Sequence, residues 1–296
     1  MALAAICLIW GTTYVVLRIA VLHFPAFLFV MIRQLIAGGL LIGFMMLVKG
    51  APVPSRAHVA RQAVAGFFMI TLGNGLVAWA EMYIPSGVAA IICSLMPVVI
   101  ILINLGVNKD ERPTVPILIG VLLGLAGILM IFGEHLSEFA QQKYQWGIAM
   151  IFIAVVSWAG GSVWLKKRGN DGDPFLNAGL QMFFGGIWLA PATLLFDDLT
   201  TVSWSHEAFY AMIYLVLIGS IVAYACYTYV LRKLPMTIVS LYAYVNPVVA
   251  VLLGWLILSE KLNLKIWIAI IITVTGIYIV NRGYQFTKFW KQQFSR

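Results

Sequence analysis

The chain has 296 residues, of which 62% are hydrophobic and 10% are charged, and it carries a formal net charge of +8. Soluble domains carry about 25% charged residues, so this composition excludes a water-soluble globular protein. Because Lys and Arg gather in the cytoplasmic loops of membrane proteins, we attribute the positive charge to topology and predict no nucleic-acid partner.

The apolar runs are long and continuous, which favours membrane-spanning helices over the alternating pattern of a β-barrel. A helix needs about 20 apolar residues to cross a bilayer. In chain order, the sequence predicts ten spans, at about residues 2–22, 27–48, 63–83, 87–107, 114–133, 146–165, 175–196, 208–231, 236–257 and 265–281. The first run has no basic stretch before it and no cleavage site after it, so we expect it to stay in the protein.

Basic residues are divided unevenly between the two sides of these predicted helices. Most of the 19 Lys and Arg residues fall in the C-terminal segment and in the loops that share its side. Since cytoplasmic segments are enriched in Lys and Arg, this asymmetry predicts that both termini are cytoplasmic. That orientation requires an even number of helices, which supports ten.

The two halves of the sequence are related. Shifting the second half back by 148 to 150 positions aligns Trp10 with Trp158, Arg18 with Lys166, Gly38 with Gly186, Pro85 with Pro235, and Pro97 with Pro247. Residues 1–140 and 141–296 then form two repeats of five helices, and an odd number of helices forces the repeats to cross the membrane in opposite directions. Inverted repeats are typical of secondary transporters, whose substrate site lies near the bilayer midplane between the repeats.

Four stretches carry a resemblance to a known family. They are Trp10-Gly11-Thr12-Thr13-Tyr14-Val15, Arg33-Gln34-Leu35-Ile36-Ala37-Gly38, Tyr83 through Pro97 to Arg112, and Leu234 through Asn246-Pro247 to Lys261. In this order and at matched spacing, they resemble the drug/metabolite transporter superfamily, and within it the bacterial EamA-type exporters.

That resemblance implies an all-α fold of ten helices around a central cavity in the bacterial inner membrane. The cavity would be lined mainly by the first, third, fourth, sixth, eighth and ninth helices, with the fifth and tenth at the periphery. The substrates would be small molecules such as amino acids, other metabolites or drugs. One departure is Gln181, which occupies the repeat position of Arg33, so the two halves differ in charge.

Three charged residues fall inside the predicted spans, where each is costly to bury unless it is paired or hydrated. Arg18, Arg33 and Glu81 lie at a similar depth near the outer helix ends, so we expect a charge cluster. Glu81 has two open interpretations, as a protonatable coupling residue or as part of a structural ion pair. Arg18 or Arg33 could hold a carboxylate, but for Arg33 a structural role is favoured because its repeat partner is neutral.

Polar and aromatic residues on the expected cavity helices are candidates for substrate binding, since rings with a polar edge suit amphipathic solutes. They are Trp10, Thr13, Tyr14, Asn74, Trp79, Ser94, Trp158, Ser162, Tyr224, Tyr227, Tyr242 and Asn246. The alternative for each is an anchor at the membrane interface or a hydrogen bond between neighbouring helices.

Pro97 and Pro247 fall in the middle of predicted helices, at equivalent places in the two repeats. A proline removes a backbone hydrogen bond and kinks a helix. We therefore interpret both as candidate hinges for alternating access, with a static packing kink as the alternative.

The sequence predicts no enzyme, cofactor or metal site. Its four His and three Cys residues are scattered, and no phosphate-binding loop is present. The favoured function is a secondary carrier that exports amino acids or similar amphipathic metabolites, with the lipid bilayer and the solute as its partners. A multidrug exporter and a facilitative channel are the alternatives, and both a monomer and a homodimer remain open.

Overall fold

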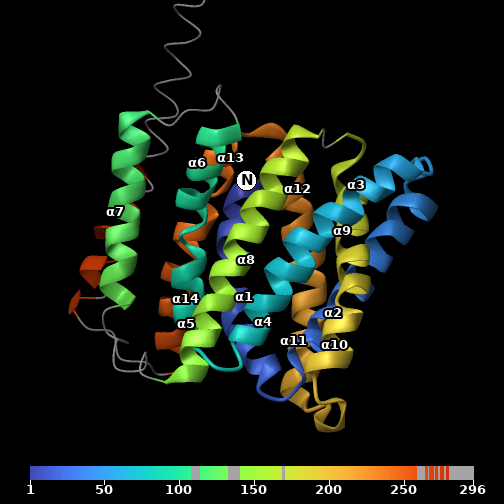
Figure 1. Ribbon diagram of the computed structural model, residues 1–296, viewed down its shortest axis with the longest axis horizontal. Coiled ribbons are helices and arrows are strands. Elements are labelled where there is room, and N and C mark those ends of the chain that lie inside the picture. The colour runs from blue at the N-terminus through green and yellow to red at the C-terminus, as the bar shows by residue number, and fades with distance from the viewer. Residues whose placement is uncertain are drawn as a thin grey trace, which may run out of the picture.

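The computed structural model describes residues 1–107, 114–132, 141–168 and 171–258, together with short helical pieces between residues 264 and 279. Within these residues, the protein is a bundle of long helices that run side by side (Figure 1). The helices of the first half are α1 (Ala2–Val21), α2 (Ala26–Gly43), η1 (Phe44–Val48), α3 (Arg56–Gly66), η2 (Phe67–Asn74), α4 (Gly75–Ala80), α5 (Ser86–Cys93), α6 (Met96–Val107) and α7 (Val115–Phe132). Those of the second half are α8 (Gln142–Lys167), α9 (Pro174–Trp188), α10 (Ala190–Phe196), η5 (Leu199–Thr201), α11 (His206–Tyr214), η6 (Leu215–Val222), α12 (Ala223–Lys233), α13 (Met236–Val239) and α14 (Tyr242–Leu258).

Six continuous helical stretches in the described residues are long and apolar enough to cross a membrane. They are Ala2–Val21, Ala26–Val48, Arg56–Ala80, Gln142–Lys167, Pro174–Phe196 and His206–Lys233. These six coincide with the first three predicted spans of each repeat. The fifth predicted span is the helix α7, and the tenth is described only in part. The protein is therefore an all-α membrane protein with several spanning helices.

The fourth and ninth predicted helices are each broken in two. The breaks lie at residues 94–95, between α5 and α6, and at residues 240–241, between α13 and α14. Pro247 lies inside α14 as expected, whereas Pro97 is the second residue of α6. The first turn of a helix has no internal backbone hydrogen bond for a proline to remove. The expectation that Pro97 lies in mid-helix is therefore wrong, because the break comes before the proline.

Helices α2 and α9 occupy equivalent places in the two halves and pack against each other through glycines. A Cβ atom on Gly38 would lie 2.5 Å from the backbone nitrogen of Phe183, and one on Gly186 would lie 3.0 Å from Cγ of Leu35. The later residue of α2, Gly38, therefore contacts the earlier residue of α9, Phe183, so the two equivalent helices are antiparallel. This is the packing that inverted repeats require.

A pair of equivalent hydrogen bonds closes the same turn in both halves. Nη1 of Arg18, near the end of α1, donates to the carbonyl oxygen of Ile84 at 3.1 Å. Nζ of Lys166, near the end of α8, donates to the carbonyl oxygen of Leu234 at 2.5 Å. Each carbonyl precedes the proline before the fourth helix of its repeat. Arg18 therefore joins the first helix to the start of the fourth, and Lys166 does the same in the inverted half.

Two π-helices also occupy equivalent places. Both η2 and η6 are eight residues long and lie in the third helix of their repeat. A π-helix is wider than an α-helix, is seldom stable by itself, and often marks a functional site. Here both segments face the centre of the bundle, where the cavity described below lies.

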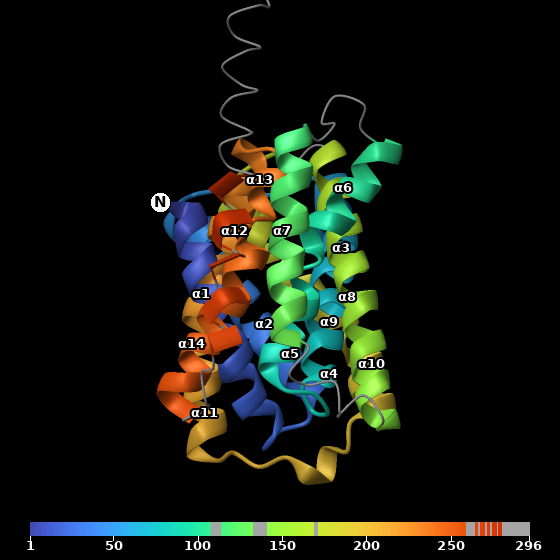
Figure 2. The same ribbon diagram turned by 90° about the vertical axis from the view of Figure 1, so that its left-hand side faces the viewer.

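Helix α7 stands at one edge of the bundle (Figures 1 and 2). Its Gly124 meets the C-terminal part of the chain, since a Cβ atom on Gly276 would lie 2.6 Å from the backbone nitrogen of Gly124. The fifth helix is thus peripheral, as the resemblance implies.

The contact between α2 and α9 predicts a position-specific loss of stability. In Gly38→Ala, the new methyl group has no room, and overpacking of this kind costs about 1–3 kcal/mol. We expect the apparent melting temperature of the purified protein in detergent to fall. Gly39→Ala is the matched control, because a Cβ atom on Gly39 meets nothing within 4 Å. Equal melting temperatures for the two variants would contradict the close packing of α2 and α9.

Candidate functional site

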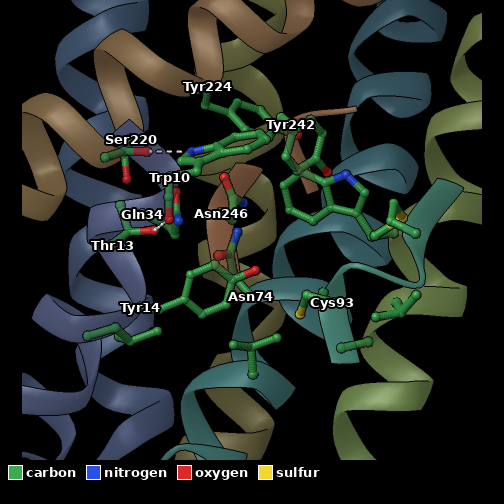
Figure 3. A pocket seen from close by; sticks show the side chains of 18 of the residues that line it. Trp10, Thr13, Tyr14, Gln34, Asn74, Cys93, Ser220, Tyr224, Tyr242 and Asn246 are labelled. Atoms are coloured by element: carbon green, nitrogen blue, oxygen red, sulfur yellow. Dashed lines mark hydrogen bonds between the residues drawn. The ribbon is translucent and has the colours of Figure 1, made fainter. Parts of the chain in front are cut away.

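A cavity of about 80 Å³ lies in the middle of the bundle (Figure 3). Its wall is formed by Trp10, Thr13, Tyr14, Leu17, Arg33, Gln34, Gly73, Asn74, Val77, Cys93, Met96, Ala154, Val155, Trp158, Gly219, Ser220, Tyr224, Tyr242 and Asn246. Trp10 and Trp158 each lie near the middle of a long helix, α1 and α8. The cavity therefore sits at mid-depth, between the two repeats.

Five aromatic rings pack together beside the cavity, and we call them the aromatic cluster: Trp10, Trp158, Tyr224, Tyr227 and Tyr242. All of them except Tyr227 line the cavity. The repeat-related Trp10 and Trp158 meet edge to face, with ring centroids 5.5 Å apart. Trp10 also lies 4.8 Å from Tyr242 and 5.2 Å from Tyr227. Aromatic pairs favour such tilted and edge-to-face arrangements. The cluster thus presents a fixed, mostly apolar surface to a solute in the cavity.

Hydrogen bonds from the second half hold the aromatic cluster in place. Nε1 of Trp10 donates to the carbonyl oxygen of Gly219 in η6 at 3.1 Å. Nε1 of Trp158 donates to the Tyr227 hydroxyl at 3.3 Å, and that hydroxyl lies 2.7 Å from Oγ of Ser162. Tyr227 and Ser162 do not line the cavity, so they support the ring of Trp158 from behind.

Tyr224 is held by a chain of buried amides. Its hydroxyl donates to Oε1 of Gln181 at 2.6 Å, and Nε2 of Gln181 donates to Oε1 of Gln62 at 2.6 Å. Gln181 is fully buried. The residue that replaces Arg33 in the second repeat thus fixes a cavity wall and does not itself line the cavity.

Other parts of the cavity wall are polar. Nε of Arg33 donates to Oγ of Ser220 at 2.8 Å, and the Arg33 side chain is almost wholly buried. Oε1 of Gln34 and Oδ1 of Asn246 are buried and have no hydrogen-bond partner. In the view of Figure 3, Gln34, Asn246 and Asn74 lie between the rings of Trp10 and Tyr14. A guanidinium group and two amide side chains therefore line the same cavity as the aromatic rings.

The expected charge cluster is only partly formed. Glu81 is fully buried, yet neither of its carboxyl oxygens has a hydrogen-bond partner. Arg18 and Arg33 act on it electrostatically, but in the described part of the chain neither guanidinium forms an ion pair with it. The structural ion pair considered for Glu81 is therefore absent, because Arg18 is engaged by Ile84 and Arg33 by Ser220.

Eight of the predicted substrate-binding residues line the cavity: Trp10, Thr13, Tyr14, Asn74, Trp158, Tyr224, Tyr242 and Asn246. Four do not, namely Trp79, Ser94, Ser162 and Tyr227. Trp79 instead packs its ring against Tyr83, with centroids 4.9 Å apart, and Ser94 is buried at the break between α5 and α6.

The second helix was not expected to line the cavity, yet it brings Arg33 and Gln34 there. Arg33 was a candidate from the sequence, whereas Gln34 and Ser220 of η6 were not. The signal was present for Gln34, a lone amide beside an arginine in an apolar segment. Among the described residues, no group of three or more His, Cys, Asp or Glu side chains is placed to hold a metal ion.

The sequence of the chain is similar to known membrane proteins. The EamA-like transporter family matches residues 1–133 and again residues 145–282. The chain is 34% identical over 286 residues to the uncharacterized inner membrane transporter YedA of Escherichia coli, covering 95% of this chain and 90% of YedA. It is 28% identical over 279 residues to protein PecM of Dickeya dadantii, covering 92% of this chain and 88% of PecM.

The fold also matches a solved protein. A known crystal structure superposes with a TM-score of 0.77 over 94% of each chain, at 19% sequence identity. At that identity the likeness concerns the fold alone.

Proposed function

Because the chain belongs to the EamA-like transporter family, which matches both of its halves, we propose that it is a secondary active transporter that works by alternating access. Its solutes are amino acids or similar small amphipathic metabolites, which it exports across the inner membrane. The chain crosses the membrane ten times in this proposal, as two inverted repeats of five helices. The relative YedA is itself described as an inner membrane transporter.

The observation that carries this proposal is the cavity between the repeats. It lies at mid-depth and joins a wall of aromatic rings to a wall with a guanidinium and amide groups. In secondary transporters with inverted repeats, the solute binds at this place. An amphipathic solute satisfies both walls at once, with its apolar part on the aromatic cluster and its polar part towards Arg33.

Alternating access would use the broken helices. Cys93 and Met96 flank the break in the fourth helix, and Tyr242 follows the break in the ninth; all three line the cavity. A bend at either break would move the cavity wall directly. In this proposal Pro97 and Pro247 keep the two segments from joining into straight helices, and each break opens the cavity towards one side of the membrane.

The orientation in the membrane follows from the basic helix ends. Arg61 of α3 donates to the carbonyl oxygen of Arg168 at 3.3 Å and lies 3.7 Å from Asp171, and Arg232 of α12 donates to the carbonyl oxygen of Gly172. The basic ends of α3, α8 and α12 thus gather around one loop. Because such ends face the cytoplasm, they support the proposal that this side is cytoplasmic and that both termini lie on it.

Two rival functions fit the cavity less well. A multidrug exporter of cations would place positive solutes beside the buried charge of Arg33, and like charges repel strongly where water is scarce. A channel would need a continuous path, whereas the aromatic cluster and its buried hydrogen bonds fill the bundle next to the cavity. The geometry therefore favours a carrier for solutes that bear an anionic group.

The carrier function predicts exchange. In proteoliposomes loaded with an unlabelled amino acid, we expect the protein to accumulate the labelled form of the same amino acid by counterflow, with saturable kinetics. The panel covers the common amino acids and, as competitors, cationic dyes. A linear flux that never saturates and shows no counterflow would contradict a carrier and indicate a channel.

Glu81 is proposed to couple transport to protons. Its carboxyl group is buried without a hydrogen-bond partner, and such burial disfavours the charged form. The charge of Glu81 acts on Arg33 in the cavity wall. Loss or gain of one proton on Glu81 would therefore change the electrostatic field at the site.

This role predicts that an imposed pH gradient changes amino-acid flux through the unaltered protein but not through Glu81→Gln. Glu207→Gln is the control, since Glu207 lies in the exposed first turn of α11. The coupling role fails if Glu81→Gln responds to the gradient as the unaltered protein does.

A further inference from the structure

Three side chains that line the cavity have hydrogen-bonding capacity that the protein does not use. Oε1 of Gln34 and Oδ1 of Asn246 lack partners although their side chains are only 1% and 2% exposed. Buried acceptors are almost always hydrogen-bonded, and each exception calls for an explanation. Both side chains line the same cavity, so a donor on a bound solute would explain both.

Arg33 supplies the complementary unused capacity. Oγ of Ser220 is its one hydrogen-bond partner among the described residues, and it is bound through Nε. A guanidinium group has five N–H donors and binds a carboxylate with two parallel bonds. Ser220 fixes the group by Nε, so the edge formed by the two terminal nitrogens is left for a solute in the cavity that Arg33 lines.

We propose that Arg33, Gln34 and Asn246 form a head-group site for a zwitterion, that is, an α-amino acid. The carboxylate of the solute binds Arg33, and its ammonium group donates to the amide oxygens of Gln34 and Asn246. The side chain of the solute lies against the aromatic cluster. This assignment rests on the proposed carrier function and adds to it the chemical class and the orientation of the solute.

Both charges of the solute are needed. A carboxylate without the ammonium group leaves two buried oxygens unpaired, and an amine without the carboxylate places a second cation beside an unpaired Arg33. A site built to hydrogen-bond a group rejects analogues that lack it, because its own buried groups are then left without partners. The cavity should therefore discriminate by head group while it tolerates different apolar side chains.

The first test compares three compounds with the same ring. We measure counterflow of labelled L-phenylalanine in proteoliposomes and its inhibition by 3-phenylpropanoate, which lacks the ammonium group, and by 2-phenylethylamine, which lacks the carboxylate. We expect each analogue to need at least about tenfold higher concentration than unlabelled L-phenylalanine for the same inhibition, which is the effect of one lost charged hydrogen bond.

The second test uses two variants that separate an effect on stability from an effect on solute binding. Gln34→Met removes an unpaired buried oxygen, so its melting temperature should not fall, while the half-saturating concentration of L-phenylalanine should rise about tenfold or more. Gln181→Met is the matched control: it breaks two buried hydrogen bonds, so it should lose stability while keeping the preference for L-phenylalanine over the two analogues. Arg33→Gln should lose the preference for L-phenylalanine over 2-phenylethylamine.

The outcomes separate this proposal from the carrier function. Saturable exchange of L-phenylalanine that both analogues inhibit as well as L-phenylalanine itself would overturn the head-group site alone. So would an unchanged half-saturating concentration in Gln34→Met. The absence of saturable exchange for every amino acid and dye tested would overturn the carrier function itself.

Discussion

Polar groups inside a bilayer have no water to bond, so each must find its partner within the protein. Many buried and part-buried polar side chains of the bundle meet this constraint. Arg18 and Lys166 bond to carbonyl oxygens, Ser162 bonds to Tyr227, and Gln181 bonds to both Tyr224 and Gln62. The oxygens of Gln34 and Asn246 at the cavity do not, nor does nearby Glu81. Nε2 of Gln62 is also buried without a partner, but it does not line the cavity. Gln34 and Asn246 do line it, so their oxygens are the ones that a bound solute would pair.

The two related halves together make one asymmetric site. Equivalent residues of the two halves have the same role where that role is structural. Trp10 and Trp158 meet at the centre, and Ser55 and Ser205 each cap the N-terminus of the third helix of their repeat. The charge of the site comes from a difference between the halves. Arg33 lines the cavity, whereas its counterpart Gln181 supports Tyr224. One repeat supplies the charge, and the other holds the aromatic wall in position.

The family, the first three helices of each repeat and the central position of both tryptophans follow from the sequence, because hydropathy and the repeat fix depth in the membrane. Rotation about each helix axis is harder to predict. Tyr227 packs against Tyr224 and Trp10 but does not line the cavity. Gln34 was missed although its neighbour Arg33 was noted. Pro97 and Pro247 each clash with the carbonyl four residues back, which predicts kinks near residues 93 and 243. The structure has breaks close to these places, at residues 94–95 and 240–241.

The central claim is that the cavity opens to one side of the membrane at a time. It can be tested with a single cysteine at Asn74, which lines the cavity, in a chain whose Cys7, Cys93 and Cys226 are replaced. The rate of modification by a membrane-impermeant thiol reagent is measured from each face of oriented vesicles, under L-phenylalanine gradients of opposite direction. Alternating access predicts that the rate from one face rises as the rate from the other falls. Rates that rise and fall together, or modification from one face under every gradient, would contradict it.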